Sequence, residues 1–193
     1  MAESVVNPNV VHFSGENPFL RLKQTMSGPD STVCALWRAH YSPAGPGHAL
    51  FVKSDATDGD ILILTDNEVL LRWVQQIEAL LRPEFGNTKL PYLEASFSRD
   101  GDTRTTYCET ATAPAAAVEL RWSGLAGGFL ISLEPGNDIA GDWGVSSFML
   151  PAGSAELIVN GRKAVGAAFP EPMAGKDSST AALAFAENWY RAP

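Results

Sequence analysis

The clearest pattern of apolar and polar residues runs from residue 59 to residue 83. Four successive apolar residues, 61–64, predict an interior strand. Beyond them, apolar side chains recur every three or four positions, as on one face of a helix; they are Val69, Leu70, Trp73, Val74, Ile77, Leu80 and Leu81. Thr65 and Glu68 fit a capping box, and Pro83 ends the pattern. The stretch therefore predicts a strand followed by a helix of about four turns.

Alternation of apolar and polar residues predicts strands along most of the remaining chain. In residues 32–41, Trp37 falls on one face, whereas Arg38 and His40 fall on the other. A loop rich in Pro and Gly leads to a second strand at 48–54, and a symmetric loop would place His40 opposite His48. Turn signals separate further predicted strands at 93–98, 103–110, 118–122, 129–134, 145–150, 155–159 and 162–169.

The two ends of the chain predict less sheet structure. Residues 1–30 are rich in Asn, Pro, Gly and Ser, so we expect an irregular N-terminal segment, with a lid over a pocket as one interpretation. At the other end, Ser179 or Thr180 can cap a short helix over residues 181–191.

These elements predict a single α+β domain, 1–193, that is mainly antiparallel β. About nine strands occur in successive hairpins without βαβ alternation, which favours a strongly curved sheet or a small barrel. We expect the amphipathic helix to pack on this sheet or to plug one end. In outline the arrangement resembles the lipocalin-like small β-barrel proteins.

Composition narrows the classes of partner and compartment. The net charge is -8 with the Lys and Arg residues dispersed, which disfavours nucleic acid. No apolar run reaches the length of about 18 residues that a membrane span needs. The first residues carry an acid where a secretory signal has positive charge, so we expect a cytoplasmic protein. Cys34 and Cys108 lack metal-site spacing, which favours two reduced thiols.

Candidate catalytic residues come from the strands, because the phosphate-binding, nucleotide-binding, hydrolase and zinc-protease motifs are absent and no organic cofactor or metal is expected. His40, His48 and Arg38 would share one face of a hairpin, where two imidazoles can exchange protons, although histidines at a hairpin mouth are often simply solvated. Glu94 and Tyr107 would be cross-strand neighbours if the loop after Arg99 has two residues. Buried by sheet closure, such groups would have shifted pKa values; in an open sheet they would be solvated.

Candidate ligand-binding residues are aromatic. Trp143 and Asp142 lie in a polar turn between two predicted strands and can line a pocket mouth, although such a Trp more often packs over a sheet edge. Trp37 and Trp122 lie on apolar strand faces and can contact an enclosed ligand.

The sequence thus leads to a hypothesis of small-molecule chemistry. We expect a small, largely apolar metabolite inside the curved sheet, converted by cofactor-independent acid–base chemistry as in an isomerase, cyclase or lyase. The alternatives are a non-catalytic ligand-binding protein, or a structural or interaction protein that forms a homodimer through a sheet edge or the last helix.

Overall fold

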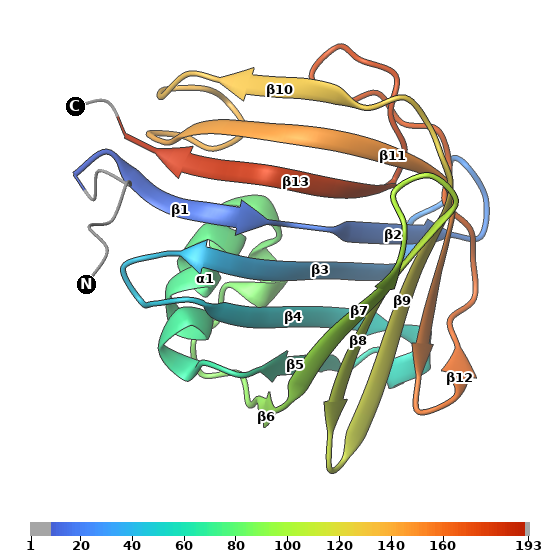
Figure 1. The fold of residues 1–193 in the computed structure, drawn as a ribbon. Helices are drawn as coiled ribbons and strands as arrows, with labels where there is room; N and C mark the ends of the chain where they lie inside the picture. Colours follow the sequence, from blue (N-terminus) through green and yellow to red (C-terminus); the bar gives the residue numbers. More distant parts are fainter. Residues whose placement is uncertain (1–8, 192–193) are drawn as a thin grey trace.

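The computed structural model describes residues 9–191 as one large, strongly bent sheet with one α-helix among the described residues (Figure 1). The helix is α1 (Glu68–Leu81), and two single 3-10 turns are η1 (Asp55–Thr57) and η2 (Pro83–Phe85). The strands are β1 (Val11–Glu16), β2 (Phe19–Lys23), β3 (Asp30–Tyr41), β4 (Gly47–Ser54), β5 (Ile61–Thr65), β6 (Leu93–Glu94), β7 (Ser96–Gly101), β8 (Thr106–Ala113), β9 (Ala116–Leu125), β10 (Phe129–Leu133), β11 (Gly144–Val159), β12 (Arg162–Lys163) and β13 (Ala181–Tyr190). The mainly β character and the accompanying helix agree with the sequence-based prediction.

The strands follow one path, in the order β6-β5-β4-β3-β1-β13-β11-β9-β8-β7, with β2, β10 and β12 attached beside it. All pairs are antiparallel except β5 with β6. Strand β11 joins two halves of the sheet. Its first part pairs with β10 and β13 in the half that contains β1–β5, and its last part pairs with β9 in the half that contains β7–β9. Figure 1 shows β7, β8 and β9 folded across the front of β2 to β5. The path has two ends, β6 and β7, so the pairing does not close into a barrel.

Two apolar layers lie on opposite faces of the β1–β5 half. Leu36, Leu50 and Val52 face β8 and β9 and pack with Val118 and Trp122 between the two halves. Buried apolar side chains from both halves of the sheet therefore meet in this layer. None of the helices in the part of the chain that the structure describes has the length and apolar character to cross a bilayer.

The opposite face of this half is covered by α1. Leu70, Leu71 and Val74 are fully buried against Phe51 and Ile63 of the sheet. The helix begins as the apolar pattern predicts, but Asn67 is its N-cap and accepts a hydrogen bond from the Leu70 N–H at 3.1 Å. The helix thus packs on a face of the sheet and plugs neither end.

Both chain ends contain more strand than the sequence predicts. The segment 181–191, expected to be a helix, is β13, a central strand between β1 and β11. Its first residues are apolar on both faces, with Leu183 against the inter-half layer and Ala184 against the other face, as a doubly covered strand requires. At the N-terminal end, β1 and β2 occupy much of the expected irregular segment, and its residues 1–8 lie outside the described residues.

Candidate functional site

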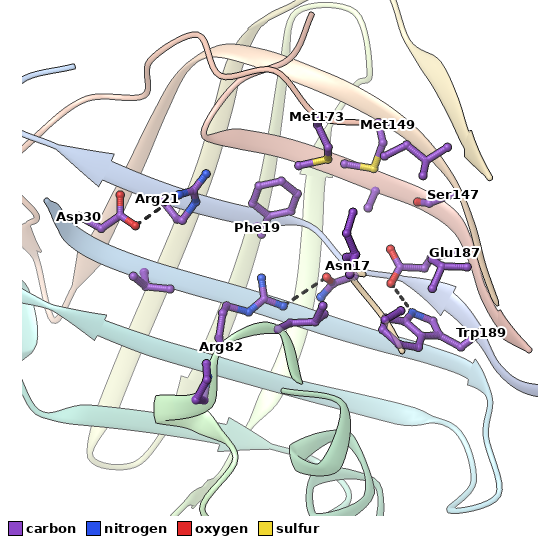
Figure 2. Close-up of a pocket in the computed structure, with 18 of the residues that line it drawn as sticks. Asn17, Phe19, Arg21, Asp30, Arg82, Ser147, Met149, Met173, Glu187 and Trp189 are labelled. Atoms are coloured by element: carbon purple, nitrogen blue, oxygen red, sulfur yellow. Dashed lines mark hydrogen bonds and ion pairs between the residues drawn. The ribbon is translucent and has the colours of Figure 1, made fainter. Parts of the chain in front are cut away.

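A cleft of about 430 Å³ lies on the helix-bearing face, beyond the C-terminal end of α1 (Figure 2). The strands β2, β3, β10, β11 and β13 contribute to it, together with η2 and the loop before β11. Most of the wall is apolar, and the side chains that form it include Phe19, Leu81, Ile131, Val145, Met149, Met173 and Ala184. An apolar wall with few polar groups is typical of a small-molecule site.

Arg82, at the end of α1, is one of two arginines that line the cleft; the other, Arg21, pairs with Asp30 and Glu171. Its side chain is 15% exposed and pairs with Glu78, with Nε–Oε2 and Nη2–Oε1 distances of 2.7 Å each. Asn17 accepts a longer hydrogen bond of 3.5 Å from Nη2 (Figure 2). Glu78 is fully buried and also accepts a hydrogen bond of 2.5 Å from the Trp37 indole N–H. The charge of Arg82 is therefore balanced inside the protein.

Glu187 of β13 is a buried carboxyl group in the cleft, which Asp30 and Glu84 also line. Burial raises the pKa of its carboxyl group to about 7, and Glu78 adds to the increase, whereas the Trp189 N–H, Arg82 and Ser147 oppose it. The indole N–H of Trp189 donates to Oε1 of Glu187 at 2.7 Å (Figure 2). A carboxyl group with this pKa exchanges its proton near neutral pH, as a general acid or base must.

Three polar atoms of the cleft have no partner of ordinary geometry among the described residues. They are Oε2 of Glu187, Nη1 of Arg82 and the buried hydroxyl of Ser147. Ser147 lies near enough to Glu187 to lower the pKa of that carboxyl group, but no direct hydrogen bond of ordinary geometry joins them. Such atoms are available to a ligand, because buried polar groups are normally hydrogen-bonded.

None of the nine side chains predicted from the sequence to form the site lines this cleft. Two of them, Arg38 and Tyr107, meet on the other face of the sheet through Glu109. Arg38 donates two hydrogen bonds to that carboxylate, at 2.7 and 2.6 Å, and the Tyr107 hydroxyl donates one at 2.9 Å. Glu16 and Arg99 complete the cluster, with Arg38 Nε and Arg99 Nη1 3.3 and 3.2 Å from the Glu16 carboxylate.

Mutual pairing is the main property of this cluster. Burial raises the pKa of Glu109, although Arg38 opposes the increase. Burial also raises the pKa of Tyr107 to about 12, and the neighbouring Glu109 adds to it. Arg38 Nε has an ion-pair contact but no hydrogen bond of ordinary geometry. Because the acids and bases otherwise pair with one another between the two halves of the sheet, the cluster is better suited to holding those halves together than to binding a ligand.

The two histidines are not opposite each other, because the hairpin pairs His48 with Arg38. Nδ1 of His48 forms a hydrogen bond of 2.6 Å with Oδ2 of Asp66. The His48 ring stacks on the Phe97 ring, with 4.6 Å between the two centroids. His40 is exposed at the end of β3. The predicted histidine pair is therefore wrong, since the loop between β3 and β4 is asymmetric in register.

Glu94 is likewise not a neighbour of Tyr107. Glu94 is exposed on β6 and pairs with Thr65, whereas Tyr107 pairs with Gly101 across a wider loop than the predicted two residues.

The predicted aromatic site is also dispersed. Trp122 is buried and donates to the backbone carbonyl of Phe19 at 3.0 Å, and Trp37 is buried beneath α1. Trp143 packs against Trp189 and lies under the Arg191 guanidinium, 4.3 Å from its ring centroid, while Asp142 is exposed. These tryptophans stabilise packing outside the cleft.

Glu187, Arg82 and Ser147 were missed because no local motif marks them. Glu187 lies in the segment that the sequence predicts to be a helix, where a lone acid is common. The available signal was an acid on a segment that is mostly apolar, Ala181 to Phe185 followed by Trp189.

Among residues 9–191 no group of three or more His, Cys, Asp or Glu side chains is arranged to hold a metal ion. Comparisons with protein-family models, with curated proteins and with solved structures find no match to this chain.

Proposed function

We propose that the protein binds a small, largely apolar molecule in the cleft beyond α1 and that Glu187 transfers a proton to or from it. The observation that carries the proposal is a buried carboxyl group, with a pKa of about 7, whose Oε2 has no partner of ordinary geometry among the described residues and which lines an apolar cleft. The volume of about 430 Å³ falls in the usual range for small-molecule sites. Isomerisation, cyclisation and elimination can proceed through such a proton transfer without an organic cofactor.

Two adjacent residues of β10 provide a test of the binding site. Ile131 lines the cleft and is 8% exposed, whereas Leu130 is 74% exposed on the opposite face of the strand. Native mass spectrometry of the purified protein, followed by thermal shifts with a broad panel of apolar compounds, would identify a ligand. We expect Ile131→Ala to weaken its binding about tenfold, because apolar contact area is lost, and Leu130→Ala to leave it unchanged. A panel without any ligand, or equal losses in both variants, would count against the cleft.

A second test addresses catalysis. Glu187→Gln keeps the shape of the side chain but removes the exchangeable acid. With a compound that the wild type converts, we expect this variant to retain binding and to lose activity by about 10²- to 10⁴-fold. Undiminished turnover would instead show that Glu187 is not the group that transfers the proton. Glu156→Gln, which replaces a carboxylate paired with Lys163 outside the cleft, is the matched control.

Self-association is a second candidate function, and one observation favours it. Leu130 and Phe148 are exposed cross-strand partners on β10 and β11, and β10 pairs with no other described strand. An exposed apolar pair at a strand edge can contact a second copy. Sedimentation of the wild type and of Leu130→Asp tests this: a dimer that the substitution dissociates supports it, and a monomeric wild type ends it.

A further inference from the structure

The charges around Glu187 restrict which polar group a ligand can place beside it. The charged or hydrogen-bonding side chains that face its carboxyl group are Arg82 and Glu78 from the end of α1, Ser147 from β11 and Trp189 from β13. Glu78 neutralises Arg82 through two contacts of 2.7 Å. A carboxylate ligand would therefore meet no uncompensated positive charge and would be repelled by Glu78 and by ionised Glu187.

An ammonium ligand fits this arrangement no better. Arg82 would repel it, and the free Nη1 of Arg82 is a donor that a cation cannot satisfy. When Glu187 is protonated, the Arg82–Glu78 pair and the carboxyl group together have no net charge. An uncharged polar group is then the one that enters the cleft with the smallest desolvation cost.

Hydrogen-bonding capacity defines that group further. Oε1 of Glu187 already accepts from Trp189, so a proton on Oε2 would be donated into the cleft. The Ser147 hydroxyl, buried and without a hydrogen bond of ordinary geometry, is the neighbouring donor. Both groups can donate to one acceptor oxygen. Resting on the proposed function, we propose that the ligand is an uncharged carbonyl compound with an apolar body, whose oxygen accepts hydrogen bonds from Glu187 and Ser147.

The apolar body has a defined place. Phe19, Met149 and Met173 line the cleft from β2, β11 and the loop before β13 (Figure 2). Methionine side chains adapt their shape and contact aromatic rings favourably, so the wall can receive a ring or a branched chain.

Four probes with one hydrocarbon body separate these alternatives: benzylacetone (a neutral carbonyl), hydrocinnamate (a carboxylate), phenylpropylamine (an ammonium) and propylbenzene (no polar group). Binding is measured by ligand-observed NMR or calorimetry with the full chain at about pH 6, below the pKa of Glu187. We expect benzylacetone to bind at least about tenfold more tightly than the other three, as one good hydrogen bond to a buried group implies.

The pH dependence tests the role of the acid. Because only the protonated form of Glu187 donates from Oε2, benzylacetone should bind about tenfold more weakly at about pH 8 than at about pH 6. The amide of Glu187→Gln donates at every pH, so binding to that variant should not change over this range. Ser147→Ala should weaken benzylacetone binding and leave propylbenzene unaffected.

Each outcome has one meaning. Preferred binding of hydrocinnamate or phenylpropylamine that Ile131→Ala weakens overturns the carbonyl assignment but preserves the proposed function. Benzylacetone binding that is independent of pH also overturns the assignment. If none of the four probes binds, and the broad panel also yields no ligand, the proposed function itself fails.

Discussion

Arg82 and Glu78 lie one helical turn apart at the end of α1 and pair through two nitrogens and two oxygens, at 2.7 Å for each contact. This pair gives the cleft its electrostatic character. With Arg82 held by Glu78, the carboxyl group of Glu187 keeps a pKa of about 7 although an arginine lines the same cleft. A guanidinium without such a partner would instead favour the binding of a carboxylate ligand.

Glu78→Gln should therefore change ligand preference. The substitution removes one negative charge that raises the pKa of Glu187 and leaves Arg82 uncompensated, so the pKa of Glu187 should fall. We expect the affinity ratio of hydrocinnamate to benzylacetone to rise about tenfold or more. Glu84→Gln is the control, because Glu84 also lines the cleft but takes no part in the Arg82–Glu78 ion pair. An unchanged ratio in Glu78→Gln would show that the pair does not set the charge of the site.

Glu187 should also make stability depend on pH. Its pKa is higher in the folded protein than the ordinary value of 4.5, so the folded state holds a proton that the unfolded chain loses. This contribution is fully present below about pH 4.5 and is lost as pH rises toward and through about pH 7.

Glu187→Gln removes this loss of stability with rising pH. Measured by urea unfolding, the variant should gain stability relative to the wild type as pH rises from about 5 to about 8, by on the order of 2–3 kcal/mol. The difference between the two proteins isolates Glu187 from other titrating groups. A constant difference across this range would contradict the raised pKa.

The Arg38–Glu109 pair should hold the two halves of the sheet together. Glu109 is 2% exposed, so Arg38→Met leaves a buried carboxylate without its main partner and should destabilise the protein by about 3–5 kcal/mol. Adding Glu109→Leu should recover most of this loss, since an apolar pair needs no desolvation of charge. A double-mutant cycle with a coupling energy near zero would indicate that the two side chains contribute independently.

The sequence was informative where a segment has one covered face. The helix was predicted because Leu70, Val74 and Ile77 repeat at helical spacing and pack on a single sheet face. β13 was mistaken for a helix because its first residues do not alternate between apolar and polar. Leu183 and Ala184 are both buried, on opposite faces, so no period of two appears.

The candidate site was beyond sequence reasoning for a different reason. Arg82 and Glu187 are far apart in the chain and meet only because β13 lies beside β1 and the helix ends above that part of the sheet. The raised pKa of Glu187 follows from burial, and burial depends on the whole topology. Likewise, His40 and His48 were separated by a shift of register that a symmetric hairpin does not anticipate.

Two glycine turns, at Gly101 and Gly161, provide a last, matched prediction. Gly101 and Gly161 both have positive φ, of 89° and 79°, where a side chain is strained. A Cβ at Gly101 would lie 2.1 Å from the Thr106 carbonyl oxygen, whereas a Cβ at Gly161 would meet nothing within 4 Å. Gly161→Ala should therefore cost only the conformational strain, about 1 kcal/mol, and Gly101→Ala should cost at least about 1 kcal/mol more, because the β7–β8 hairpin must open. Urea unfolding of both variants measures the difference. Equal losses would mean that the β7–β8 hairpin relaxes at Gly101 without cost. The wide loop that follows Gly101, and not a tight turn at the glycine, would then decide the register of the hairpin.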